Sequence, residues 1–130
     1  MDATERELAQ QLAAHPRWRW MAGMVAVHHD DGTYARRFRG SEPDGAFLRV
    51  QSRGRLIVPD LTDPATCGCL LAMLWEVYSL ASVDVTEEGK GLASHGTWYT
   101  VSAWSLGPWA ARSVGTALAF ALLAALEKPA

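Results

Sequence analysis

Two periods of apolar and polar positions run through this chain, and the longer one predicts three helices. Apolar side chains recur at helical spacing over Ala3–Ala14, Pro64–Tyr78 and Val114–Glu127. Asp63 and Ser113 directly precede the second and third segments, and both residue types cap helices by accepting bonds from free backbone N–H groups. We therefore expect helices near both ends of the chain and in its middle.

The shorter period predicts strands between the helices, because β-branched and aromatic residues favour a pleated surface. The predicted strands are Trp18–His28, Thr33–Phe38, one or two short strands within 47–58, Val83–Thr86 and Thr97–Trp104. Asp30-Asp31-Gly32 is a turn signal, and Gly107-Pro108 is expected to end the last strand. The element order is α-β-β-β-α-β-β-α. Since short turns join antiparallel strands, we predict an α+β fold, with a mainly antiparallel sheet and helices packed on it.

Length and composition restrict the class of protein without indicating a function. The chain has 130 residues and a mass of 14.2 kDa, which fits a single domain over 1–130. Its apolar fraction of 49% and charged fraction of 20% exclude an intrinsically disordered chain. The net charge of −2 predicts no non-specific attraction to phosphate. The polar first residues and the short apolar run Ala117–Leu126 predict neither a signal peptide nor a membrane span.

The second predicted helix contains Cys67, Gly68 and Cys69. The two thiols point about 200° apart on a helix, so they cannot bridge each other or share a metal ion. No basic residue is near them in sequence to lower a thiol pKa, and we interpret them as small apolar side chains of a cytosolic protein. Gly68 costs a helix about 1 kcal/mol relative to Ala, so we expect it to mark close packing against a neighbour.

Six tryptophans are many for this length, and tryptophan is typical of cores and interfaces. Trp75 shares a helix face with leucines and is predicted to lie in the core. Two pairs each share a predicted strand face and are expected to be buried: Trp18 with Trp20, and Trp98 with Trp104. Trp109 follows the Gly107-Pro108 break outside any predicted element, so we expect it to be an exposed anchor for a partner.

The clearest metal-like cluster is His28-His29-Asp30-Asp31. Adjacent residues of a strand point to opposite faces, so at most one histidine and one aspartate can converge, for example His28 and Asp30. A third ligand would have to come from His95. The alternative is a hairpin end with solvated polar side chains. No nucleophile elbow or phosphate-binding motif is present, so the sequence predicts no catalytic residue and no cofactor.

Basic side chains gather between positions 34 and 55, with aromatic residues among them. The arginines are Arg36, Arg37, Arg39, Arg49, Arg53 and Arg55, and the aromatics are Tyr34, Phe38 and Phe47. On paired hairpins they would form one positive face, which suits a nucleotide, a phosphodiester or an acidic protein. The alternative is a solvated sheet edge on which charge discourages aggregation. The candidate partner-binding residues are Arg36, Arg37, Arg39, Arg53, Arg55, Tyr34 and Trp109.

Two blocks carry a resemblance to a family. Over Trp18–Met24 and Pro59–Ala72 the chain resembles small, uncharacterised proteins encoded by tailed phages and prophages, and the similarity extends to the last predicted helix. The resemblance implies a phage accessory protein that acts in the cytoplasm of the bacterial host. Such proteins often neutralise host defences, so it also implies an anti-defence role, for example an anti-CRISPR-like one. It brings no catalytic residue to this chain.

Three functions follow as hypotheses. The first is a non-enzymatic binding protein that blocks a host macromolecule, such as a subunit of a defence complex, with tryptophan and arginine as anchors. The second is a protein that sequesters a nucleotide between aromatic and arginine side chains. The third is a small metal-dependent enzyme built on His28 and Asp30. An exposed sheet edge also leaves a homodimer open.

Overall fold

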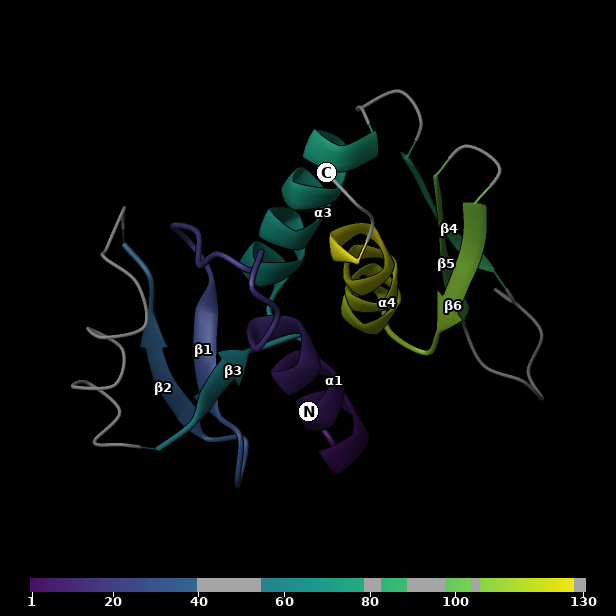
Figure 1. The fold of residues 1–130 in the computed structure, drawn as a ribbon. Helices are drawn as coiled ribbons and strands as arrows, with labels where there is room; N and C mark the ends of the chain where they lie inside the picture. Colours follow the sequence, from purple (N-terminus) through teal and green to yellow (C-terminus); the bar gives the residue numbers. More distant parts are fainter. Residues whose placement is uncertain (40–54, 79–82, 89–97, 104–105, 128–130) are drawn as a thin grey trace.

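A layer of helices separates two small antiparallel sheets (Figure 1). The computed structural model describes residues 1–39, 55–78, 83–88, 98–103 and 106–127. Within these residues the fold is α+β, as predicted, with one more strand than expected. The sequence predicts one sheet, whereas the strands form two, because the strands that precede the middle helix and those that follow it pair only among themselves.

The first sheet is formed by β1 (Val25–His28), β2 (Tyr34–Arg37) and β3 (Ile57–Pro59), in the order β2-β1-β3. β1 is buried along most of its length, as the central strand of a sheet inside the molecule. The predicted turn between β1 and β2 is confirmed, and Gly32 adopts a φ of 74° there. The register shifts within this pair, so that β2 carries one extra residue opposite β1.

The second sheet is formed by β4 (Val83–Glu88), β5 (Trp98–Ala103) and β6 (Leu106–Ala111), in the order β4-β5-β6. The sequence does not predict β6, because Gly107-Pro108 reads as a strand break. That prediction is wrong: both residues lie within β6. β6 is an edge strand, and a proline is tolerated where its missing N–H faces away from the ladder.

The helices agree with the sequence prediction to within one residue at each end. They are α1 (Ala3–Ala13), α3 (Pro64–Tyr78) and α4 (Val114–Leu126). Asp63 accepts a bond from the Thr66 N–H at 2.9 Å, and the Ser113 hydroxyl accepts one from the Thr116 N–H at 3.2 Å, so both predicted caps are confirmed. Among the described residues, the helices are all too short or too polar to cross a membrane.

α4 occupies the centre of the molecule, between α1, α3 and the second sheet (Figure 1). It is buried on most of its surface, as expected for a helix that is apolar all round. Only a glycine at position 115 lets α4 pack this closely against the Leu61 backbone, because a Cβ there would lie 1.7 Å from the Leu61 carbonyl oxygen. The prediction for Gly68 is wrong: a Cβ at this exposed position would meet no atom within 4 Å. The close helix packing therefore falls at Gly115.

The tryptophans differ from their predicted places. Trp75 is 38% exposed and not a core residue. Trp18 and Trp20 are half-buried and precede the first strand, because the predicted strand Trp18–His28 is regular only from Val25 onward. Trp104 and the side chain of Trp98 lie outside the described residues.

Candidate partner-binding site

The segment that leads from α1 into β1 is fastened to the end of β2. The Gly23 N–H donates to the Phe38 carbonyl at 2.9 Å, and the Phe38 N–H donates to the Met24 carbonyl at 2.8 Å. Gly23 adopts a φ of 98°, in the left-handed region that favours glycine. These bonds place the two tryptophans that precede Gly23 beside the last residues of β2.

Three aromatic rings and one guanidinium group stack at this point, and we call them the aromatic–arginine cluster: Trp18, Trp20, Phe38 and Arg36. Trp18 and Trp20 meet edge to face, with ring centroids 5.5 Å apart and planes at 86°. The Trp20 ring lies parallel to the Phe38 ring at 4.8 Å and 5°. The Arg36 guanidinium carbon lies 5.4 Å from the centre of the Phe38 ring. Each geometry is an attractive one for aromatic and cationic groups.

Burial divides the cluster into a base and a rim. Phe38 is only 3% exposed and belongs to the core. The two tryptophans pack against that core while remaining half-buried, and Arg36 is also half-buried. The Nε and Nη1 atoms of Arg36 are buried. The ring that the core fixes holds this side chain in place, so less rotamer entropy is lost when its accessible atoms contact a partner.

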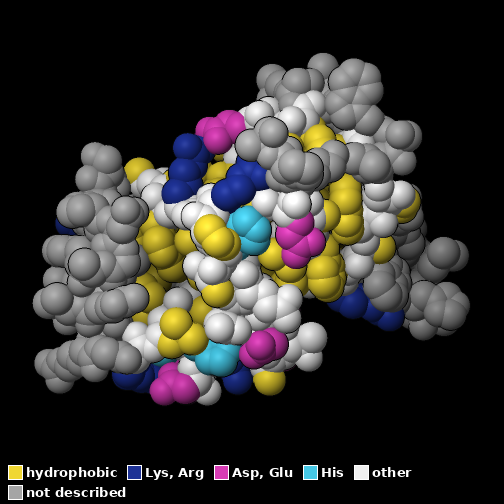
Figure 2. Space-filling view, viewed as in Figure 1, with side chains coloured by type: hydrophobic (Ala, Val, Ile, Leu, Met, Phe, Trp, Pro, Cys, Tyr) yellow, Lys and Arg dark blue, Asp and Glu magenta, His cyan; other side chains and the backbone are white. Residues whose placement is uncertain are grey.

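The other predicted arginines do not join Arg36 in one positive face. Arg37 donates to the Gly23 carbonyl at 2.9 Å and lies 3.5 Å from the Asp63 carboxylate. Arg55 lies at the other end of β1, where it donates to Asp30 at 2.6 Å and to Asp31 at 3.1 Å. Arg39 is exposed, and Arg53, Arg49 and Phe47 lie outside the described residues. Basic side chains at the top and lower left of Figure 2 adjoin acidic ones.

Tyr34 is 65% exposed on β2. Leu56, just before β3, is also exposed. Tyr34 and Arg36 lie on β2, whereas the other members of the cluster lie in segments that flank β1 and β2. The first sheet and the described residues that flank its strands therefore offer an exposed tyrosine, an exposed leucine and a supported arginine.

Trp109 is not the exposed anchor that the sequence predicts. It lies on β6 opposite Val101, half-buried and packed against the core. Its ring covers Gly107, where a Cβ would lie 2.9 Å from a ring carbon. The expectation fails because the residue belongs to a strand, so its ring direction is set by the sheet.

The carboxylates of the metal hypothesis are used in other contacts, whereas the Nδ1 atom of His28 is buried and has no hydrogen-bond partner among the described residues. Arg55 donates to the Asp30 carboxylate and holds its pKa below the ordinary value. The bonds from Thr33, and then those from Arg55, lower the pKa of Asp31 to about 2. The His29 ring lies 3.4 Å from the Glu7 carboxylate. No three metal-ligating side chains converge within the described residues, and His95 lies outside them.

The two thiols are poorly placed for nucleophilic chemistry. Burial, together with the nearby negative charges of Asp63 and Asp60, raises the pKa of Cys67 to about 11. Its Sγ lies 3.4 Å from the Leu61 carbonyl. Burial also raises the pKa of Cys69. At neutral pH both side chains are thiols, and the thiol is the unreactive form.

The sequence prediction found Arg36 and Tyr34 but missed the stack that supports the arginine. The available signal was the Trp18-Arg19-Trp20 alternation, which puts two rings on one side of an extended segment. Nothing in the sequence showed that Phe38 would lie beside them. Comparisons with family models, with curated proteins and with solved structures found no match for this chain.

Proposed function

We propose that this chain is a non-enzymatic binding protein that contacts a host macromolecule with the aromatic–arginine cluster and the exposed residues around it. The contact of Arg36 with the Phe38 ring, and the packing of Trp20 and Trp18 beside that ring, carry the proposal. Tryptophan, tyrosine and arginine dominate the binding energy of protein interfaces, above all where they are held in place before the partner arrives. Tyr34 and Arg39 extend this surface along and beyond β2.

The way the Phe38 ring is packed favours a protein partner over a nucleotide. A base needs a free aromatic face on which to stack. Phe38 is only 3% exposed and is stacked on Trp20, so it offers no such face. Arg37 and Arg55 are engaged by carboxylates and are poorly suited to hold phosphates. A cluster whose central ring is buried suits a complementary protein surface better than a small ligand that must stack on a ring.

The resemblance to phage and prophage accessory proteins suggests the kind of partner. We propose a component of an antiviral defence system of the bacterial host, blocked by steric occlusion. This mechanism needs no catalytic group on the phage protein. Its surface must bind tightly enough to exclude the natural ligand of the host component.

The proposal is tested by affinity capture from a bacterial host lysate, followed by measurement of the affinity for the purified partner. We expect a Tyr34→Ala/Arg39→Glu double variant to weaken binding at least about tenfold, since each exposed anchor contributes more than about 1 kcal/mol. A Val85→Ala/Glu127→Lys variant is the control, because it truncates an exposed apolar side chain and reverses an exposed charge at positions outside the first sheet.

A partner that binds the double variant as tightly as the wild type would contradict the proposal. Melting temperatures measured with mononucleotides and cyclic nucleotides supply the other decisive result. A ligand that binds the folded state raises the melting temperature. A rise with any nucleotide, abolished by Arg36→Lys, would favour nucleotide sequestration.

A further inference from the structure

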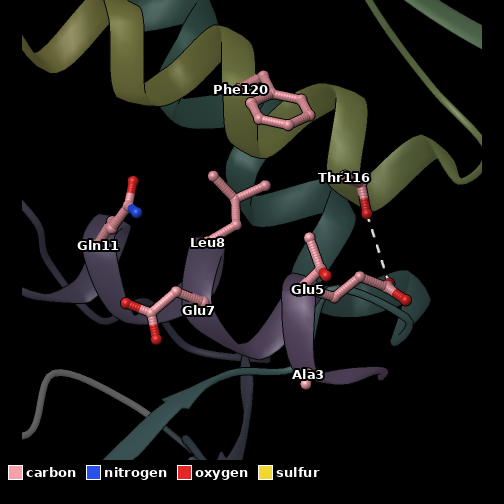
Figure 3. A pocket seen from close by; sticks show the side chains of 8 residues that line it. Ala3, Glu5, Glu7, Leu8, Gln11, Thr116 and Phe120 are labelled. Carbon is pink, nitrogen blue, oxygen red and sulfur yellow. Dashed lines mark hydrogen bonds between the residues drawn. The ribbon is translucent and has the colours of Figure 1, made fainter.

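A second surface lies away from the aromatic–arginine cluster, in the groove between α1 and α4. Its volume is about 420 Å³, within the range of about 300–1,000 Å³ that ligand pockets occupy. The groove is lined by Ala3, Thr4, Glu5, Glu7, Leu8, Gln11, Thr116 and Phe120. Figure 3 shows the Phe120 ring on α4 above Leu8 of α1, with Glu5 at one side of this apolar pair and Glu7 and Gln11 at the other.

The apolar part of the groove leaves the Phe120 ring exposed to solvent. Phe120 is 41% exposed, although most residues of its helix are buried. Leu8 below it is buried and forms the floor. A large exposed ring over a hollow is costly in water, and burying it against another apolar side chain is favourable.

The polar part of the groove is acidic and partly fixed. The Thr116 hydroxyl donates to Glu5 at 3.4 Å, and the Asp2 N–H donates to the same carboxylate at 3.3 Å (Figure 3). Thr116 is held in turn by a 2.7 Å bond from the Ser113 hydroxyl. A carboxylate has about four acceptor sites, so Glu5 keeps room for further donors. None of the lining residues that the structure describes is a lysine or an arginine.

We propose that this groove binds a basic, apolar segment of a partner protein, with an arginine or lysine side chain beside the glutamates and an apolar side chain on Phe120. Charge complementarity selects this occupant. Among the described residues, neither Glu5 nor Glu7 is paired with a lysine or an arginine, although the His29 ring lies 3.4 Å from the Glu7 carboxylate. The two carboxylates therefore attract a cation, and the ring beside them accepts its stem and favours its charge. An acidic segment would meet repulsion from both glutamates. This surface does not use the cluster, so the two proposals can fail separately.

The first test selects displayed random peptides on the wild-type chain and removes those that also bind a Glu5→Gln/Glu7→Gln/Phe120→Ala variant. Circular dichroism and thermal melting show whether this variant is folded before it is used. We expect the remaining peptides to carry lysine or arginine close to a large apolar residue. Remaining peptides without basic residues, or no remaining peptides, would overturn the proposal.

The second test measures the affinity of one selected peptide by fluorescence anisotropy. We expect Glu5→Gln/Glu7→Gln and Phe120→Ala each to weaken binding at least about tenfold, and substitution of the peptide's basic residue by Glu to do the same. Glu127→Gln is the matched control, because it removes an exposed charge just after the same helix, outside the groove. Equal losses in Glu127→Gln and Glu5→Gln/Glu7→Gln would show a non-specific charge effect and overturn the proposal.

Discussion

The aromatic–arginine cluster and the α1–α4 groove both bring a phenylalanine and charged side chains together, but they fill space in opposite ways. In the cluster, Phe38 is stacked on Trp20, lies 5.4 Å from the Arg36 guanidinium carbon and is almost fully buried. In the groove, the Phe120 ring stands over a hollow. The charge also differs, because a guanidinium caps the first surface and two carboxylates border the second.

This difference separates stability from binding. A filled cluster is part of the core, so its residues stabilise the fold as well as offering a surface. The residues of an open groove have few contacts to lose, so changing them should alter binding with little effect on folding. Substitutions on the two surfaces should therefore have unequal effects on the free energy of unfolding.

The largest effect is expected at the helix that carries the groove wall. Gly115→Ala places a methyl group against the Leu61 carbonyl, a backbone atom that cannot move aside cheaply. We expect a loss of about 3 kcal/mol or more in the free energy of unfolding, measured by urea denaturation. Gly68→Ala is the control, since its methyl group meets nothing and should stabilise α3 by up to about 1 kcal/mol. Equal effects of the two substitutions would refute this account of the packing.

The next effect compares the two surfaces directly. Trp20→Ala removes the ring that stacks on Phe38 and should cost about 2–3 kcal/mol, because burial is partial. Phe120→Ala removes an exposed ring and should cost less than about 1 kcal/mol. Both values come from denaturant unfolding followed by circular dichroism. A Phe120→Ala loss as large as that of Trp20→Ala would show that the groove is part of the core.

How far the sequence predicts this molecule depends on how local each signal is. The three helices follow from apolar periodicity and from capping residues that bond to an N–H only three residues further along the chain. Both signals are local, so the helices are predicted almost to the residue. β6 is missed because a proline is acceptable only on an edge strand, and edge position depends on which strands pair. Trp109 is misplaced for the same reason.

The candidate site is predicted in its parts but not in its arrangement. Arg36 and Tyr34 stand out by residue type, but the stack under Arg36 needs two segments that the backbone bonds of Gly23 and Phe38 bring together. The prediction of one positive face is wrong because Arg55 and Arg37 pair with carboxylates at opposite ends of β1. Such pairings depend on strand register, and the extra residue in β2 changes that register.

A smaller effect concerns the attachment of the cluster's sheet to α3. Thr66 is fully buried, and its hydroxyl accepts a bond from the Val25 N–H at 2.9 Å and donates to Asp63 at 3.1 Å. Thr66→Val keeps the shape but leaves the Val25 N–H without an acceptor, which should cost about 1–2 kcal/mol. Amide hydrogen exchange at Val25 should speed up in Thr66→Val and less so in Thr66→Ser. Unchanged exchange in Thr66→Val would contradict the role of this bond.

The smallest effect concerns the exposed charges at the β1–β2 turn, which carry little of the fold's stability although they lie on the cluster's sheet. The pKa of Asp31 is lowered in the folded state, from 3.8 to about 2, first by the Thr33 bonds and then by Arg55. Stability from this carboxylate is therefore present above pH 3.8 and is lost as the pH falls towards about 2. Asp31→Asn should flatten the fall of the melting temperature across this window. An NMR titration separates the two causes: Thr33→Val should raise the pKa of Asp31 by removing the largest single contribution, whereas Arg55→Gln should have the larger effect on Asp30, whose pKa is lowered mainly by that arginine. If Thr33→Val left the pKa of Asp31 unchanged, the Thr33 hydroxyl would not hold this carboxylate in its charged form, and the account of the turn would be wrong.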